Sequence, residues 1–311
     1  MKRSLFVLLC AAMFFDNIVA QQDPQYSQYM FNQLAINPGY AGSRDAICAT
    51  ALHRQQWVGI KGAPVTSVFS AHMPFRLFGG DHGAGLNITS DELGFNQDLS
   101  IGLNYAYRID VGPGKLGIGL SGIFLNKALS ATWYIPPTGS GYAPPVDDEA
   151  IPEENASEMG FDMGFGLFYR SDRAYLALST THLLQPEMNH TTLKRHYYAN
   201  AGCVIPLKNP VWELDPSLMA YSDGTASQVT VNVNIMYNKK MWGGLGYRLN
   251  DAIVGMIGID IFDGLRVGYS YDYSYTDVRR YSGGSHEIVI NYCFNLIKEK
   301  IIKKYKSVRF L

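Results

Sequence analysis

Apolar and polar residues alternate along most of this chain. From Leu265 to Tyr275 every second side chain is apolar or aromatic, and the side chains between them are polar, charged or very small. A period of two indicates a β-strand whose two faces meet different surroundings. The same alternation is clear in residues 97–108, 160–170, 227–237 and 285–295. The pattern therefore predicts an all-β protein.

About fourteen segments qualify as strands, and most are close to the ten or so residues that a tilted strand needs to cross a bilayer. An even number of strands is typical of bacterial membrane barrels and places both chain ends on the same side. The predicted strands are 45–54, 64–73, 83–89, 97–108, 115–126, 160–170, 174–182, 195–205, 211–221, 227–237, 241–249, 252–261, 265–275 and 285–295.

The connections between these segments differ in length. At one end they are mostly tight, as at 206–210 and 238–240, although 75–82 is long for such a turn. At the other end several are long, as at 55–63 and 276–284. Outer-membrane barrels combine short periplasmic turns with longer outer loops. We therefore predict a transmembrane antiparallel β-barrel of about 14 strands, with lipid outside and a polar lumen inside.

The first twenty residues have the features of a secretory signal peptide. Lys2 and Arg3 precede an apolar stretch at 5–15, and Ile18-Val19-Ala20 fits a cleavage site. We expect cleavage near Ala20 and a mature protein in the outer membrane. The predicted organisation is a signal peptide at 1–20, an N-terminal segment at the periplasmic mouth at 21–44, the barrel at 45–296 and a basic periplasmic tail at 297–311.

Composition and motifs restrict the chemistry. A net charge of -1 argues against nucleic acid as a partner. Beyond the leader, Cys48, Cys203 and Cys293 are odd in number and far apart, so we expect isolated, mostly buried cysteines rather than a disulfide framework or a metal site. The chain has no phosphate-binding glycine loop, no zinc-protease motif and no nucleophile elbow. We therefore predict no catalytic residue, no cofactor and no metal, with a hydrolase built from distant residues as the enzymatic alternative.

Residues 23–43 break the alternation and carry a family resemblance. They begin Asp-Pro-Gln-Tyr-Ser-Gln-Tyr-Met-Phe-Asn and end Asn-Pro-Gly-Tyr-Ala-Gly-Ser. This block resembles the mature N-terminus of the PorP/SprF family of type IX secretion system outer-membrane proteins. Further similar segments follow in order, with Arg-Gln-Gln-Trp at 54–57, Gly-Ala-Pro at 62–64, Gly-Ala-Gly-Leu at 83–86 and a terminal strand around 286–294.

The resemblance implies a non-enzymatic component of the type IX secretion system that serves secretion, surface localisation or gliding. Its partners would be periplasmic lipoprotein or ring components of the machine, a secreted surface cargo or adhesin, and outer-membrane lipid. The competing prediction is a passive channel or porin for small solutes. The N-terminal block either closes the periplasmic mouth by packing or offers a docking surface for a partner.

Eight residues are candidate partner contacts. Trp57 is either a recognition anchor or a member of the interfacial aromatic belt. The amphipathic tail either touches a periplasmic component or is a frayed tail, free or resting on headgroups. The candidates are Tyr26, Tyr29, Met30, Phe31, Trp57, Lys61, Lys303 and Lys304.

Charged residues on the predicted inner face form a candidate lumen network. Such charges would be expensive in a soluble core unless all were paired, but are expected in a wet lumen, where they fill it, line a pore or hold a plug. The network comprises Arg108, Asp162, Glu213, Arg266, Asp272 and Glu287, with Asp215 and Asp260 on the same face. The acidic segment 127–159 is predicted to be a solvated outer loop, with a calcium site as the alternative.

Overall fold

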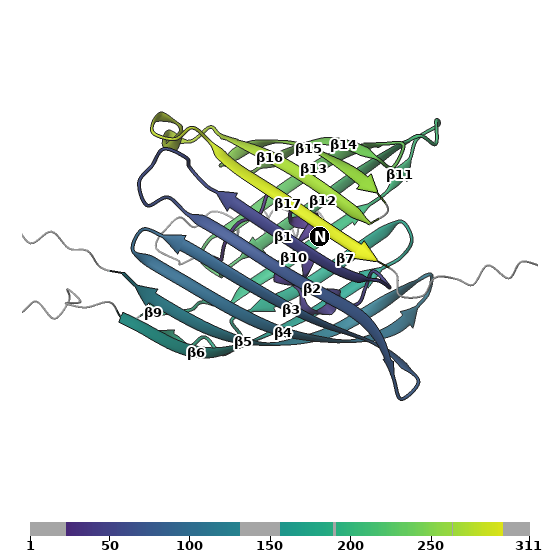
Figure 1. Ribbon diagram of the computed structural model, residues 1–311, viewed down its shortest axis with the longest axis horizontal. Coiled ribbons are helices and arrows are strands. Elements are labelled where there is room, and N and C mark those ends of the chain that lie inside the picture. The colour runs from purple at the N-terminus through teal and green to yellow at the C-terminus, as the bar shows by residue number, and fades with distance from the viewer. Residues whose placement is uncertain (1–22, 131–155, 189–190, 263, 295–311) are drawn as a thin grey trace, which may run out of the picture.

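The computed structural model describes residues 23–130, 156–188, 191–262 and 264–294 (Figure 1). Outside these ranges lie the predicted signal peptide, Lys303 and Lys304 of the basic tail, and most of the acidic segment 127–159. The barrel strands are β1 (Ile47–Gln55), β2 (Val65–Leu77), β3 (Gly80–Leu93), β4 (Asn96–Val111), β5 (Gly114–Leu129), β6 (Ala156–Arg170), β7 (Ala174–Thr181), β10 (His196–Cys203), β12 (Trp212–Ser222), β13 (Ser227–Tyr237), β14 (Met241–Arg248), β15 (Ala252–Phe262), β16 (Leu265–Ser274) and β17 (Ser285–Phe294).

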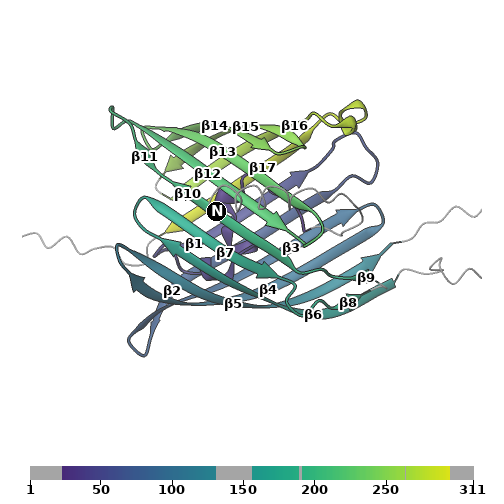
Figure 2. The ribbon, with the colours of Figure 1, turned by 180° about the vertical axis from the view of Figure 1, so that it is seen from behind.

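These fourteen strands form a closed antiparallel barrel (Figures 1 and 2). Each strand pairs with its neighbours in the chain, and β1 pairs with β17 to complete the ring. Outside the ring of long strands, β8 (Glu187–Met188) pairs with β9 (Thr191–Thr192), and β11 (Ile205–Pro206) extends the sheet beside β12. Each of the fourteen predicted strands corresponds to one barrel strand, so the predicted fold is confirmed.

The barrel places its apolar side chains outside and its polar side chains inside. On β4, Leu99, Ile101 and Leu103 point outward and are exposed, whereas Asn104 and Arg108 point inward and are buried. This arrangement reverses that of a soluble protein, and it matches the alternation of a barrel whose outside meets lipid.

No helix in the described part of the chain has the length and hydropathy needed to cross a bilayer.

The two ends of the barrel differ, and we name them by their connections. The long-loop end carries the connections 56–64, 182–195 and 275–284, and the short-turn end carries 78–79, 112–113 and 171–173. The connection between β2 and β3 corrects the sequence-based prediction, because these strands continue to Leu77 and from Gly80 and leave only a two-residue turn. This hairpin extends beyond its neighbours (Figure 1). Pro74 and the glycines of β3 weaken the strand signal there, while a ring stack between Phe75 and His82 holds the pair.

A disulfide between Cys48 and Cys293 corrects the prediction of isolated cysteines. The two residues lie opposite each other in the β1–β17 pairing although they are 245 residues apart in the chain. Ring closure makes the first and last strands neighbours, which the spacing of the cysteines does not reveal. Cys203 is free and partly buried.

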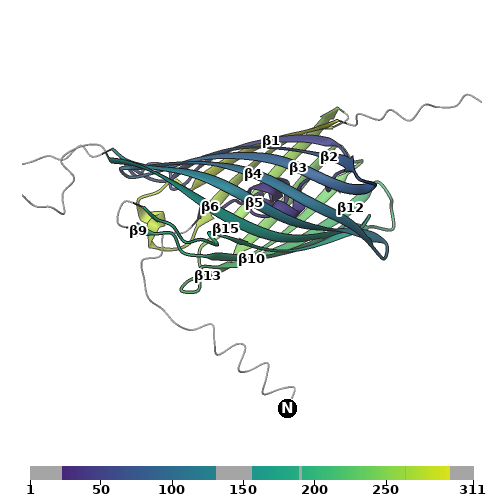
Figure 3. The same ribbon diagram turned by 90° about the horizontal axis from the view of Figure 1, so that it is seen from below.

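The segment that precedes β1 lies inside the barrel (Figure 3). It contains three short 3₁₀ helices, η1 (Tyr29–Phe31), η2 (Gln33–Ala35) and η3 (Pro38–Tyr40), and a fourth, η4 (Asp277–Arg280), lies in the connection before β17. We call residues 23–44 the plug. The sequence-based expectation put this segment at one mouth, whereas the structure places it along the lumen, because its aromatic and amide side chains find apolar and polar partners on the inner wall.

Candidate functional site

The plug crosses the lumen from one end of the barrel to the other. Asp23 contacts His182 at the long-loop end, and the amide of Gly42 donates to Nδ1 of His72 on the opposite side at 3.2 Å. Between these points the plug reaches strands around the whole barrel: Ser27 carbonyl with Asn232, Tyr29 with Ser217, Gln33 with Asn200, Ile36 carbonyl with Ser179, and Asn37 with the carbonyl of Leu167. The plug is thus fixed on many sides.

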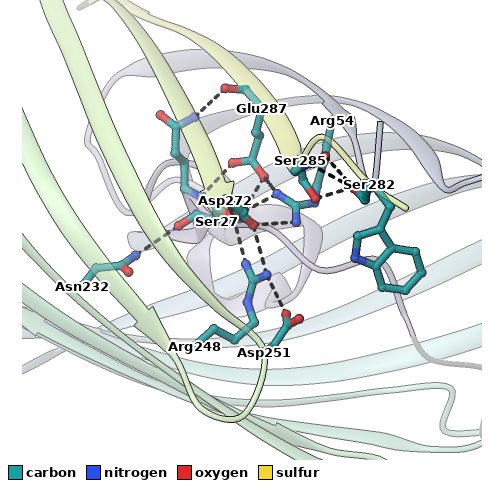
Figure 4. Close-up of polar contacts among 12 residues, drawn as sticks. Ser27, Arg54, Asn232, Arg248, Asp251, Asp272, Ser282, Ser285 and Glu287 are labelled. Atoms are coloured by element: carbon teal, nitrogen blue, oxygen red, sulfur yellow. Dashed lines mark hydrogen bonds and ion pairs between the residues drawn. The ribbon is translucent and has the colours of Figure 1, made fainter. Parts of the chain in front are cut away.

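Ser27 is the centre of the strongest attachment (Figure 4). Its hydroxyl lies 2.7 and 2.8 Å from the two carboxylate oxygens of Asp272, and it accepts hydrogen bonds from Arg54 at 2.9 Å and Arg248 at 2.8 Å. The backbone amides of Ser27 and Gln28 donate to the carboxylate of Glu287 at 2.8 and 2.7 Å. We call Ser27, Arg54, Arg248, Asp272 and Glu287 the latch.

The latch is a buried and mutually compensated set of charges. Arg54 contacts Asp272 at 2.7 Å and Glu287 at 3.2 Å, and these three side chains are 1% exposed or less. Arg248 contacts Asp272 and Asp251, both at 3.1 Å. Removing one member of such a set leaves an uncompensated buried charge, which typically costs about 3–5 kcal/mol. The latch therefore favours a single position of the plug.

Glycines in the barrel wall let the C-terminal part of the plug approach the wall closely. A Cβ atom on Gly117 or Gly119 of β5 would overlap the backbone of Gly39, and a Cβ on Gly83 of β3 would overlap that of Ala41. Only glycine lacks this atom, so the glycines of these strands leave space for the plug.

The first described residue of the plug joins a cluster of polar side chains at the long-loop end. Oδ1 of Asp23 is 2.8 Å from Nε2 of His182, and Oδ2 accepts hydrogen bonds from Tyr198 at 2.6 Å and Thr181 at 3.0 Å. Nδ1 of His182 is 2.6 Å from Oδ2 of Asp162. We call Asp23, His182 and His196 the histidine cluster.

Two members of the histidine cluster, Asp23 and His182, have strongly shifted pKa values. Burial acts to raise the pKa of Asp23, but the charges of His182 and His196 and the Tyr198 hydroxyl hold it well below its usual range. Burial acts to lower the pKa of His182, which follows the end of β7, but the carboxylates of Asp23 and Asp162 outweigh this effect and raise it to about 10. Asp23 and His182 therefore form an ion pair at neutral pH.

Two cavities lie at the ends of the plug. One of about 500 Å³ at the long-loop end is lined by the histidine cluster, Trp57, Asp91 and Lys127, among others. The other, of about 560 Å³, lies at the short-turn end and is lined by residues that include Met30, Phe31, Arg170, Asp260 and Arg266.

The candidate partner contacts fall into three environments. Tyr26 and Tyr29 are buried inside the barrel, at 5% and 0% exposure, so they do not offer a surface to a partner in this arrangement. Met30 and Phe31 are half-buried and face the cavity at the short-turn end. Trp57 is partly buried and Lys61 is exposed, both in the connection between β1 and β2.

The candidate lumen residues all lie on the inner side, but in separate groups. Arg108 pairs with Asp45 at 2.8 Å, Arg266 with Asp260 at 2.6 Å, and Glu213 with Lys239 at 4.0 Å. Asp162 belongs to the surroundings of the histidine cluster, and Asp272 and Glu287 belong to the latch. The predicted network is therefore divided into separate local groups. Two of these groups, the latch and the histidine cluster with Asp162, hold the plug.

Sequence reasoning missed several residues of the site. Ser27, Arg248 and the histidine cluster were not identified, and Arg54 was noted only as part of a motif. Arg54 follows the alternation of its strand and faces inward with Leu52, which was the available signal. Ser27 and Asp272 are 245 residues apart in the chain, so nothing local indicates that they meet.

Comparisons with known proteins add a family and distant structural likenesses. The family model for the type IX secretion system membrane protein PorP/SprF matches residues 18–292. Similar solved structures include the Acinetobacter baumannii outer membrane protein Omp33, with 8% identity, TM-score 0.45, and coverage of 80% of this chain and 99% of that one. The Ralstonia pickettii toluene transporter TbuX gives 10% identity, TM-score 0.48, and coverage of 85% and 93%. A Rhodopseudomonas blastica porin triple mutant gives 10% identity, TM-score 0.34, and coverage of 80% of this chain and 99% of that one.

At these TM-scores the structural likenesses support no inference about function. No curated protein matches the chain.

Proposed function

We propose, from the premise that this chain belongs to the PorP/SprF family of type IX secretion system membrane proteins, that it is a non-enzymatic scaffold in the outer membrane. It would anchor a secreted surface protein, periplasmic components of the machine, or both. The observation that carries the proposal is the plug, which occupies the lumen and is held by the buried latch. A filled lumen suits a barrel that presents surfaces to partners better than one that passes solutes.

The arrangement of Ser179 and His182 favours a role without catalysis. Both ring nitrogens of His182 face carboxylates, those of Asp23 and Asp162, and the hydroxyl of Ser179 donates to the backbone carbonyl of Ile36 at 2.7 Å. A serine nucleophile needs a histidine within hydrogen-bond reach to accept its proton. This pair is instead engaged in holding the plug.

Two connections at the long-loop end form a joint surface that suits a partner outside the cell. The amide of Val58 donates to the carbonyl of Gly284 at 2.8 Å, and the amide of Gly283 donates to the carbonyl of Val58 at 2.7 Å. The amide of Trp57 donates to Ser285. Lys61 and Tyr281 are exposed on this surface, and tyrosine is enriched in protein interfaces.

The β2–β3 hairpin offers a contact at the other end. Phe78 at its tip is 99% exposed and has a φ of 50°, a left-handed conformation that a bulky side chain rarely adopts. Asparagine or glycine would fit this turn better, so the phenylalanine has a local cost without any packing in return. We propose that Phe78 inserts into a partner in the periplasm.

Site-specific photo-crosslinking in cells tests both surfaces. A crosslinking amino acid placed at Lys61 should capture a secreted protein, and one placed at Phe78 should capture a periplasmic component, each identified by mass spectrometry. Matched exposed positions are Thr225 at the long-loop end and Lys239 at the short-turn end, which should capture neither. Equal capture at all four positions, or at none, would refute the proposed surfaces.

Planar-bilayer recording separates the scaffold from the channel. The purified protein should give no steady conductance while the plug is in place. A large and steady conductance from the unmodified protein would favour a passive porin for small solutes and would overturn the scaffold proposal.

A further inference from the structure

We propose that Asp23, His182 and His196 bind a divalent transition-metal ion of the zinc class, which fastens the start of the plug to the barrel wall. The three residues each offer one ligand atom, and these atoms lie within 4.8 Å of one another. Zinc binds imidazole nitrogen and carboxylate oxygen at about 2.0–2.2 Å, which places the ligand atoms of a tetrahedral site about 3.4 Å apart. The widest pair must therefore close by up to about 1.4 Å, and Asp23 and His182, whose ligand atoms are 2.8 Å apart, must separate slightly. This inference stands apart from the proposed secretion role.

Both histidines are oriented as metal ligands usually are. Nδ1 of His182 faces Asp162, which is fully buried, and Nδ1 of His196 lies 2.9 Å from the carbonyl of Lys194. These acceptors hold the Nδ1 proton of each ring, so Nε2 of each ring is directed at Asp23. An incoming ion displaces the Nε2 proton that His182 shares with the Asp23 carboxylate at 2.8 Å, and it replaces the hydrogen bond that the Asp23 amide donates to Nε2 of His196 at 3.3 Å. A carboxylate or carbonyl behind each ligating imidazole is the common outer arrangement of metal sites.

The carboxylate of Asp23 is also held in place. Its Oδ2 accepts the hydroxyls of Tyr198 and Thr181, so Oδ1 remains the atom that faces His182. Asp162 in turn is fixed by the amides of Met163 and Leu184, at 2.7 and 3.1 Å. A site whose ligands are positioned before binding loses little conformational freedom when the ion enters.

The adjacent cavity supplies the remaining requirements. The histidine cluster lines the cavity of about 500 Å³ at the long-loop end, so an ion can enter from that side and water can complete its coordination. Asp91 lines the same cavity and attracts cations, whereas Asp98 and Asp251 there are paired with Lys127 and Arg248. Two nitrogens and one oxygen favour zinc, cobalt or nickel, whereas calcium requires six or more oxygen ligands.

The test uses the full mature chain without a histidine tag, refolded in detergent and freed of metal with EDTA. Titration with Zn²⁺ followed by calorimetry should show one site, and the same titration with Ca²⁺ should show none. His196→Ala should weaken Zn²⁺ binding at least 100-fold, while Asp162→Asn, which removes only the outer acceptor, should weaken it about 10- to 100-fold. His286→Ala, a histidine on the outer surface beside Tyr269, is the matched control and should bind as the unmodified protein does.

A second readout does not depend on the variants folding equally well. Co²⁺ bound to the unmodified protein should give the intense visible absorption of a four-coordinate site, and equimolar Zn²⁺ should remove it. Heat-modifiable mobility in gels reports whether each variant forms a barrel, and His196→Gln replaces the alanine variant if that one does not. Absence of Zn²⁺ binding, equal binding of Ca²⁺, or unchanged binding in a folded His196 variant would each overturn the proposal.

Discussion

Replacing Arg54 with methionine should release the plug. Arg54 stands between the carboxylates of Asp272 and Glu287, and all three side chains are almost completely buried. Methionine keeps much of the volume and removes the charge. Once the plug has left, water can reach the carboxylates, so the cost of their unpaired charge falls mainly on the plugged state.

The free-energy cost of Arg54→Met to the plugged state follows from the contacts that remain. Breaking a buried ion pair costs about 3–5 kcal/mol. Asp272 keeps Arg248, and Glu287 keeps the two amides of the plug, so the lower value applies. A cost of about 3 kcal/mol raises the population with a detached plug by about 100-fold.

The measurement is the rate at which a cysteine in the plug reacts with a soluble maleimide. Asn32→Cys is a suitable reporter because Asn32 is 1% exposed and, among the described residues, its side chain accepts one long hydrogen bond, from Ser70 at 3.4 Å. Cys203→Ser removes the free thiol. When the plug opens and closes faster than it is labelled, the rate follows the detached population, so Arg54→Met should speed labelling about 100-fold.

An exposed arginine provides the control. Arg76 pairs with Asp81 at 3.0 Å but is 84% exposed, and such pairs contribute about 0–1 kcal/mol, so Arg76→Met should change the labelling rate by less than about fivefold. If Arg54→Met leaves labelling unchanged, or if the parent reporter is labelled as fast as an unfolded peptide, the latch does not hold the plug.

Three further predictions concern the wall, the ring closure and the hairpin. Gly119→Ala should loosen the plug and speed labelling of the Asn32→Cys reporter by about 5- to 100-fold, the equivalent of about 1–3 kcal/mol of overpacking. The control Gly122→Ala, on the lipid side of the same strand, should leave the labelling rate unchanged, and equal rates for the two variants would refute the close approach of the plug to β5. A chain expressed without residues 1–20, and so without Cys10, should show one reactive thiol, that of Cys203, when it is denatured without reductant, and three after reduction; three thiols before reduction would disprove the Cys48–Cys293 bond. Phe78→Asn should weaken capture by a crosslinking amino acid placed at the neighbouring exposed Leu77, because the inserting ring is lost. It should also raise the free energy of unfolding by up to about 1 kcal/mol, because asparagine tolerates the left-handed turn; a lower urea midpoint would contradict the assigned strain.

The strands were predictable because their signal is local. Within β4 or β13, alternation identifies the two faces without reference to any other part of the chain, and strand length suits a bilayer. The inward position of Asp272 and Glu287 followed from the same rule. The alternation of apolar and polar residues was therefore sufficient to predict the barrel and the side of each strand that faces the lumen.

The plug and its attachments were not predictable in this way. Short 3₁₀ turns have no long periodicity, so residues 23–44 showed only that they differ from the strands. Glu287 meets Ser27 across 260 residues, and Cys48 meets Cys293 across 245. Such contacts depend on how the ring closes, which one sequence does not encode locally. The aromatic residues Tyr26 and Tyr29 suit a partner surface as well as an interior, and only their burial separates the two.

The latch has a consequence for how the protein is made. Glu287 and Cys293 lie on β17, the last strand in the described part of the chain, and they bind Ser27 and Cys48, which lie near the beginning of that part. A truncated product that lacks this strand leaves one edge of β1 unpaired, the other edge being paired with β2, and has no acceptor for the amides of Ser27 and Gln28. The plug can therefore be locked in the lumen only after β17 has been synthesised, so a locked plug marks a barrel whose strands are all in place.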